Sequence, residues 1–192
     1  MSELIVEAEV KYELSQAQFF ALPEKLDAFG FQRQEKLAHE DHYVFYQKNP
    51  IGGYDFERYR KITGVNGGSF LWNRKARAKD SKGKGVRVED GEQVTAQEFE
   101  QALVSAVQDH PVVHKKRQDF GGKIEHFTAT VSLDEALFNG IKKYFLEVEI
   151  LTDLEQGNFA RRLCKDFAKD VLGITSKSAP GYLRQYLAAR AP

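Results

Sequence analysis

Hydrophobic and charged residues alternate over about residues 3–13, with hydrophobic side chains at even positions and Glu7, Glu9 and Lys11 at odd positions. A period of two predicts a β-strand with one hydrophobic face and one polar face. Seven later segments have strand character and are separated by glycines, as turns between antiparallel strands should be. They are expected at about 34–47, 54–63, 69–77, 84–90, 112–119, 123–132 and 144–152. Gly121-Gly122 is expected to form the turn between the sixth and seventh strands.

Helical spacing occurs in three segments. Ser15 with Gln18, and Thr95 with Glu98, have the spacing of a capping box, which marks a helix N-terminus. Pro23 falls inside the first helical pattern and should kink or divide it. The helices are expected at about 15–29, 95–110 and 155–172. Strands joined mostly by short turns, with few helices, predict an α+β fold on a large antiparallel sheet or barrel.

Composition narrows the class of protein. The 192 residues suit a single domain over 1–192, and 42% hydrophobic with 29% charged residues is typical of a globular protein. Cys164 is the only cysteine, which excludes an intramolecular disulfide and a cysteine-based zinc site. The N-terminus does not resemble a signal peptide, and no apolar stretch reaches the roughly 18 residues of a membrane span. We therefore expect a cytoplasmic protein without a membrane partner. The 28 basic and 28 acidic residues argue against a general nucleic-acid binder.

Charges at alternate strand positions are sorted by sign. On any one strand, a solvated polar face is the ordinary interpretation. A solvated face normally mixes signs, however, whereas here whole strands carry basic or acidic pairs. If the sheet closes with this face inward, its interior is a polar tunnel. The basic residues are Arg58, Arg60, Lys75, Arg77, Arg87, Lys115 and Arg117, and the acidic pairs are Glu7 with Glu9 and Glu147 with Glu149.

The two signs predict one combined site. Arginine and lysine bind phosphate oxygens, arginine with two parallel hydrogen bonds. Clustered carboxylates repel one another unless a divalent cation lies among them, and Mg²⁺ or Mn²⁺ commonly bridges carboxylates and substrate phosphates. The pattern therefore predicts a site for a metal-bound polyphosphate.

The charged motifs resemble those of a known family. Glu7-x-Glu9-x-Lys11 is similar to the ExExK signature of the CYTH superfamily, the triphosphate tunnel metalloenzymes. Further similar motifs follow in order along nearly the whole chain. They are Asp41-x-Tyr43, Arg58-x-Arg60, Leu71-Trp72-Asn73-Arg74-Lys75, Arg87-x-Glu89, Lys115-x-Arg117, Leu133-Asp134 and Phe145-x-Glu147-x-Glu149. The resemblance implies an eight-stranded antiparallel closed β-tunnel with helices packed outside.

The resemblance also implies roles for the tunnel residues. Lys11 is the candidate to orient or deprotonate an attacking water. The implied metal ligands, or residues that support ligands, are Glu7, Glu9, Asp134, Glu147 and Glu149. The implied triphosphate-binding residues are Lys11, Arg58, Arg60, Lys75, Arg87, Lys115 and Arg117.

Three functions fit this pattern. The first is hydrolysis of tripolyphosphate, thiamine triphosphate or a nucleoside triphosphate, with Mg²⁺ or Mn²⁺ as cofactor. The second is a class IV-type adenylyl cyclase, in which the ribose 3′-hydroxyl attacks the α-phosphate of ATP. The third is a polyphosphate or nucleotide sensor without catalysis, which missing carboxylates would favour. The sequence leaves the oligomeric state open, a homodimer included.

Other polar residues have ordinary structural interpretations. His114 alternates with Lys115 and is expected outside the tunnel, and His126 is expected outside as well, with the tunnel as its alternative position. Cys164 and Trp72 are expected to pack against neighbouring elements. Residues 79–84 are expected to form a solvated loop, with a basic lid as the alternative.

Overall fold

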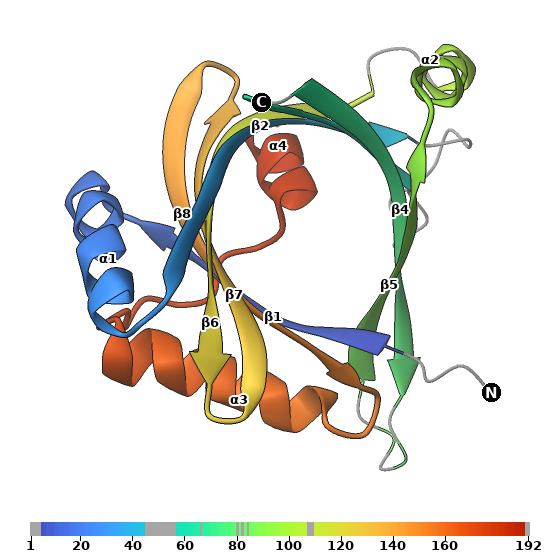
Figure 1. Cartoon of the computed structure of the whole chain (residues 1–192). Coiled ribbons are helices and arrows are strands. Elements are labelled where there is room, and N and C mark those ends of the chain that lie inside the picture. Colours follow the sequence, from blue (N-terminus) through green and yellow to red (C-terminus); the bar gives the residue numbers. More distant parts are fainter. Residues whose placement is uncertain are drawn as a thin grey trace.

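Eight antiparallel strands form a closed barrel in the order β1-β5-β4-β3-β2-β6-β7-β8 (Figure 1). The computed structural model describes residues 5–44, 57–65, 67–79, 81, 83, 85–106 and 110–190, without the side chains of 75–79 and 85–90. The barrel confirms the α+β class and the eight-stranded tunnel. The strands are β1 (Ile5–Leu14), β2 (Gln32–Val44), β3 (Glu57–Gly64), β4 (Gly67–Lys79), β5 (Gly85–Val94), β6 (Val112–Ile124), β7 (Phe127–Phe138) and β8 (Ile141–Asp153).

The first and last strands lie side by side. β1 pairs with β8 along its whole length, from Ile5 opposite Asp153 to Leu14 opposite Tyr144. On its other side, β1 is aligned with β5 at Glu7 and Arg87. The order of strands therefore places the acidic pairs of β1 and β8 together, while basic β3 and β6 flank β2 elsewhere on the barrel wall.

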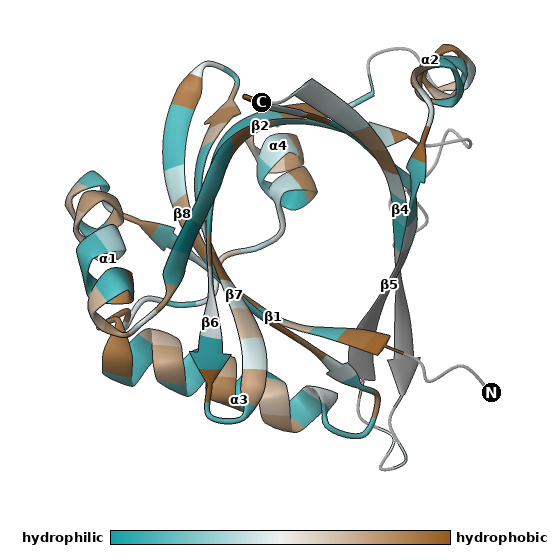
Figure 2. Cartoon of the chain, viewed as in Figure 1, coloured by the Kyte–Doolittle hydropathy of each residue, from teal (hydrophilic) through white to brown (hydrophobic). Residues whose placement is uncertain are grey.

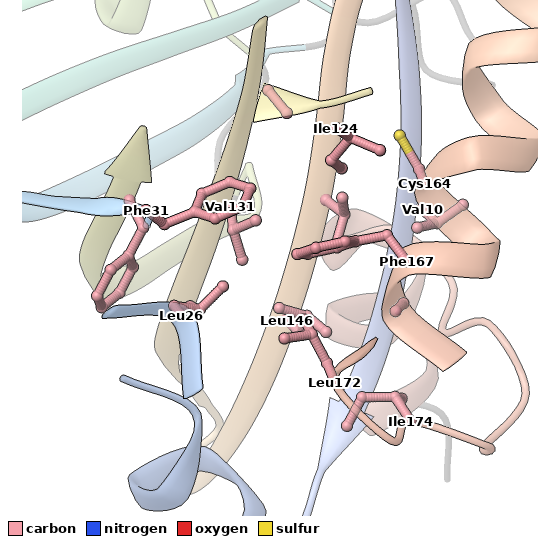
Figure 3. Close-up of a cluster of buried hydrophobic side chains, with 14 of the residues drawn as sticks. Val10, Leu26, Phe31, Ile124, Val131, Leu146, Cys164, Phe167, Leu172 and Ile174 are labelled. Atoms are coloured by element: carbon pink, nitrogen blue, oxygen red, sulfur yellow. The ribbon is translucent and has the colours of Figure 1, made fainter. Parts of the chain in front are cut away.

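The main hydrophobic core lies outside the barrel. Helix α1 (Gln16–Ala28), helix α3 (Gly157–Asp166) and the π-helical turn η1 (Phe167–Val171) pack their hydrophobic residues against β1 and β6–β8. Figure 3 shows part of this cluster, in which Val10 and Leu146 face Phe167 and Leu172. Hydrophobic and hydrophilic bands alternate along α3 (Figure 2), as expected for a helix that covers a sheet. Burial of the outer face leaves the inner face free for polar residues.

A helix that the sequence did not predict lies inside the barrel. Helix α4 (Tyr182–Arg190) occupies one end of the ring of strands (Figure 1). Its Tyr182 packs into a second hydrophobic cluster with Tyr43 and Phe145. Tyr43 and Phe145 lie on the inward face of their strands, as Asp41 and Glu147 do. The hydrophobic cluster therefore fills this end of the tunnel, and the charged side chains lie farther along it.

The predicted turn at Gly121-Gly122 is wrong. Strand β6 continues through both glycines to Ile124, and the chain reverses at Glu125-His126, where Glu125 has a φ of 54°. A side chain at Gly122 would come within 2.6 Å of the ring of Phe31. The glycine therefore allows close packing on the outer face of the strand.

The helix N-termini predicted from the sequence are present in the structure. Both capping boxes are confirmed: Ser15 Oγ accepts from the Gln18 amide, and Thr95 Oγ1 accepts from the Glu98 amide, each at 3.2 Å. The second predicted helix is α2 (Ala96–Ser105). Pro23 does not divide α1, which is one uninterrupted helix. Among the described residues, no helix has the length and apolarity needed to cross a membrane.

Candidate active site

A polar pocket lies within the barrel, with about 250 Å³ of empty space that is partly open to solvent. Every residue that lines it belongs to the set predicted from the sequence. Carboxylates come from β1 and β8, and basic side chains come from β3 and β6. The lining residues are Glu7, Glu9, Arg58, Arg60, Lys115, Arg117, Glu147 and Glu149.

The acidic wall of the pocket consists of Glu7 and Glu9 on β1 with Glu147 and Glu149 on β8. Glu9 is the direct partner of Glu149, which is a pair of like charges, whereas Glu147 is the direct partner of Lys11. Like charges at directly opposite positions destabilise a sheet. Glu147 forms ion pairs with Lys11 and Arg117. Burial alone would raise the pKa of Glu147, but Arg117 and Lys11 hold it well below its ordinary value. Glu147 is therefore a carboxylate that the protein itself neutralises.

The remaining carboxylates fit a hard divalent cation. Mg²⁺ is usually bound through one or two carboxylates, with water and substrate phosphates completing its shell. Glu7, Glu9 and Glu149 supply such oxygens at the pocket. Within the described part of the chain, no group of three acidic, histidine or cysteine residues could hold a metal by itself. A cation here would therefore need phosphate or water oxygens as further ligands.

Asp134 has a different environment from the pocket glutamates. It is fully buried, and its two oxygens accept from Arg117 at 2.7 and 2.5 Å. Lys115 Nζ lies 3.4 Å away, and the Tyr182 hydroxyl donates to Asp134 at 2.6 Å. Burial would raise the pKa of Asp134, but Arg117 and Lys115 lower it. Of the two roles implied by the resemblance, this geometry favours support over direct metal ligation.

Asp41 performs the same task for Arg60. Its oxygens accept from Arg60 Nε at 2.5 Å and Nη2 at 2.9 Å, and its side chain is fully buried. Burial would raise the pKa of Asp41, but Arg60 and Lys115 hold it well below the ordinary value. The sequence placed Asp41 in a motif without giving it a role. Its position on the inward face of β2, given by the alternation along that strand, was the feature of the sequence that could have indicated this role.

Lys115 is the most deeply buried cation of the pocket, with 4% of its surface exposed. Its Nζ lies 3.9 Å from Asp41 and 3.4 Å from Asp134. Burial and the nearby Arg117 lower the pKa of Lys115 to about 7, against the opposing effect of Asp134. A lysine whose pKa is lowered in this way is suited to exchange a proton near neutral pH.

Tyr182 was missed by the sequence reasoning. Lys11 Nζ lies 3.5 Å from the centre of its ring, and Lys115 Nζ lies 4.9 Å away. Burial and the carboxylates of Asp134 and Glu147 raise the pKa of Tyr182 well above its ordinary value, so it remains a donor. The sequence signal was weak, because Ser178-Ala179-Pro180-Gly181-Tyr182 resembles the C-terminal Ser-Tyr of the CYTH superfamily only loosely.

Two predicted triphosphate-binding side chains lie outside the described residues. Lys75 and Arg87 are placed by the backbone register alone, Lys75 opposite Glu89 and Arg87 opposite Glu7. In the segment 79–84, predicted to be a solvated loop with a basic lid as the alternative, residues 80, 82 and 84 lie outside the described residues. The amide of Ser81 in this segment donates to Glu155 at 3.0 Å.

The other singled-out residues lie away from the pocket. His114 is exposed on the outside of β6. His126 is exposed in the β6–β7 turn, with its ring 4.1 Å from that of Phe127. Cys164 is buried in α3, where its thiol donates to the Ala8 carbonyl at 3.3 Å. These positions agree with the structural interpretations of all three residues.

Solved structures with the same fold include three instructive cases. The PH1819 protein of Pyrococcus horikoshii has a TM-score of 0.74 at 23% identity, covering 96% of this chain and 99% of that one. A candidate adenylate cyclase from Bacillus halodurans has a TM-score of 0.66 at 15% identity, covering 94% of this chain and 97% of that one. HpAC1 from Hippeastrum is a candidate adenylyl cyclase described as having a dominant triphosphatase activity. It has a TM-score of 0.59 at 16% identity, covering 98% of this chain and 97% of that one.

Likeness at this level of identity shows a shared fold. No protein-family model matches the sequence, and a search of curated proteins finds no match. The barrel expected from the CYTH resemblance is thus supported by whole-chain structural likeness.

Proposed function

We propose that this protein is a CYTH-type, metal-dependent triphosphatase. The observation that carries the proposal is the pocket, in which carboxylates of β1 and β8 and basic residues of β3 and β6 line one space. Such a division of charge suits a chain of phosphates bridged to a divalent cation. The triphosphatase activity described for HpAC1, a protein with the same fold, is consistent with this choice.

Residue roles follow from the contacts. Glu7, Glu9 and Glu149 would hold Mg²⁺ or Mn²⁺. When bound, such a cation neutralises phosphate charge and lowers the pKa of a coordinated water. Arg60 and Arg117, whose side chains are fixed by buried carboxylates, would stabilise the charge that develops on the transferred and leaving phosphates.

Two lysines are candidates to act on the attacking water. Lys11, the residue predicted to act on the attacking water, is paired with Glu147 and lies over Tyr182. That placement favours orienting the water. Lys115, with a pKa near 7, is better suited to accept its proton, because a useful general base has a pKa close to the working pH.

The test is incubation of the pure protein with tripolyphosphate, thiamine triphosphate and ATP, each with Mg²⁺ or Mn²⁺. We expect metal-dependent release of phosphate or pyrophosphate from at least one substrate. Formation of cyclic AMP from ATP would instead identify a cyclase. If neither metal supports any product, the protein is not an enzyme of this kind.

A matched set of variants tests the acidic wall. Glu9→Gln and Glu149→Gln should each lower metal-dependent hydrolysis on the order of 100-fold, because charge stabilisation at the phosphates is lost. Glu13→Gln is the control: Glu13 lies on the same strand but is exposed and paired with Lys143 at 3.0 Å. Full activity in both pocket variants would show that the metal is held elsewhere.

A further inference from the structure

A buried histidine has no role in the site described above. His39 lies on β2 two residues before Asp41, on the inward face, with 5% of its surface exposed. The register aligns it with Ile62 on β3 and Lys115 on β6. Among the described residues, neither ring nitrogen has a hydrogen-bond partner. Buried polar atoms nearly always have one, so the ring calls for a partner supplied from outside the protein.

The surroundings of His39 indicate what that partner is. Burial, followed by Arg60, Lys115 and Arg117, lowers the pKa of the ring to about 2. Asp41 is the opposing carboxylate, and Arg60 takes both of its oxygens. The imidazole is therefore neutral, with one N–H donor and one acceptor nitrogen. These three cations line the pocket; His39 is not itself a lining residue, and its position beside the pocket follows from its pairing with Lys115 in the sheet.

We propose that His39 is an uncharged hydrogen-bond donor of the triphosphate site, with a phosphate oxygen as its acceptor. The proposal rests on the proposed function and extends it to a further binding residue. Phosphate oxygens are the acceptors that the guanidinium groups of Arg60 and Arg117 would attract. A neutral donor adds a hydrogen bond to phosphate without adding a further positive charge to these basic residues.

This role differs from that of an acid or base. The groups that act on His39 are Asp41 on its own strand, Arg60 on β3, and Lys115 and Arg117 on β6. Their combined effect keeps the ring neutral across the range in which enzymes are assayed. Its contribution to binding should therefore not change with pH between 6 and 8.

The experiment compares tripolyphosphate binding to the wild type, His39→Leu and His39→Gln by calorimetry at pH 6, 7 and 8, with EDTA to prevent turnover. Wild-type protein should bind. His39→Leu should bind about 10-fold more weakly, since a hydrogen bond to a charged group is lost. His39→Gln, which retains a neutral N–H donor, should bind within about 3-fold of the wild type. The ratio of wild-type to variant affinity should be the same at each pH.

Two further measurements separate binding from folding. Without ligand, His39→Leu should unfold at the same or a higher urea concentration than the wild type, because an unpartnered polar group has been removed. The control His114→Leu, on the outside of the neighbouring strand, should leave affinity unchanged. In ¹⁵N-histidine-labelled wild type, tripolyphosphate should shift the ring nitrogen resonances of His39. This measurement does not depend on the folding of any variant.

The outcomes are distinct. Wild-type protein that binds no tripolyphosphate overturns the triphosphate site and His39 with it. Wild-type binding with equal affinity in His39→Leu, or with unshifted His39 resonances at saturation, overturns the role of His39 alone. Weaker binding accompanied by an equal loss of stability in both His39 variants assigns the residue to folding and also overturns its binding role.

Discussion

Two arginines of the pocket owe their positions to buried carboxylates. Arg60 is fixed by Asp41 and Arg117 by Asp134, each through two hydrogen bonds. A guanidinium held in this way has lost its conformational freedom before any phosphate binds. The two aspartates therefore determine where the basic groups of the pocket point.

Removing one of these aspartates should be costly. Asp41→Asn leaves Arg60 buried with its charge uncompensated, and we expect a loss of about 3–5 kcal/mol in the free energy of unfolding, measured with urea. Asp27→Asn breaks the exposed pair with Arg33, at 2.8 Å, and should cost far less. Equal losses in the two variants would contradict the importance of burial.

The same pair predicts a dependence on pH. The pKa of Asp41 in the folded protein lies well below its ordinary value of 3.8. A lowered pKa means that stability is present above the unfolded value and is lost as the pH falls through the folded value. Wild-type stability should therefore fall below about pH 4, and the fall should be shallower in Asp41→Asn.

Lys115 should titrate far from an ordinary lysine. NMR titration of lysine side chains in the free protein should show one group with a pKa near 7, against 10.5 for an unperturbed lysine, and Lys115→Arg should remove that signal. If the lysine proves to be the general base, the arginine variant should lose roughly 100-fold or more in kcat, because arginine stays protonated. A Lys115 that titrates above pH 9 would remove it as a candidate base.

Single residues of the site were predictable to different degrees. Alternation and sign were enough to place Glu9, Arg60 and Lys115 in one pocket. The partners of Asp41 and the isolation of His39 were not predictable, because both depend on which strands β2 adjoins. That order of strands is a property of the closed barrel.

At the level of elements, strand ends were the weak point. Gly121-Gly122 has the composition of a turn, yet the ring of Phe31 requires a residue without a side chain at Gly122. By contrast Asn139-Gly140, with φ of 48° and 80°, forms the β7–β8 turn, because there the backbone itself needs left-handed residues. Local composition does not distinguish these two uses of glycine.

Helix α4 was missed for a related reason. Only Tyr182 and Gln185 of this short helix are buried, so its sequence lacks the long hydrophobic stripe of a helix that covers a sheet. Only the closed barrel provides its partners, Tyr43 and Phe145 among them. No local pattern in the sequence could therefore reveal its position.

Tyr182 should couple α4 to the pocket. Tyr182→Phe keeps the ring beneath Lys11 but removes the 2.6 Å hydrogen bond to Asp134, and it should destabilise the protein by about 1.5–3 kcal/mol. Tyr186→Phe, on the same helix and partly buried against the same cluster, is the control and should have a smaller effect. Urea unfolding of both variants decides, and equal effects would mean that the Asp134 bond contributes little.

At the scale of the whole molecule, the barrel brings together charges from both ends of the chain. Glu9 and Glu149 are far apart in sequence and directly opposite in the sheet. The sequence pattern predicted that the two acidic pairs belong to one site, because clustered carboxylates repel one another unless a divalent cation lies among them. Arg117 on the basic side of the pocket already pairs with Glu147 on the acidic side, and a metal-bound triphosphate, which carries charges of both signs, would bridge the two sides further.

A divalent cation and a triphosphate should therefore stabilise the protein together more than either does alone. A ligand present at 100 times its Kd stabilises by about 2.7 kcal/mol, which for a chain of this size corresponds to a rise in Tm of about 5–10 °C. We expect that rise with Mg²⁺ plus tripolyphosphate, measured by calorimetry, and smaller rises with each separately. In the double variant Glu9→Gln/Glu149→Gln, tripolyphosphate should still bind the basic residues of the pocket, while added Mg²⁺ should give no further rise in Tm.

The two ligands should also strengthen each other's binding. Because coupling between two ligands is reciprocal, Mg²⁺ must strengthen tripolyphosphate binding in the wild type by the same factor as tripolyphosphate strengthens Mg²⁺ binding. Independent, additive shifts in the wild type would mean that the two walls do not form one site.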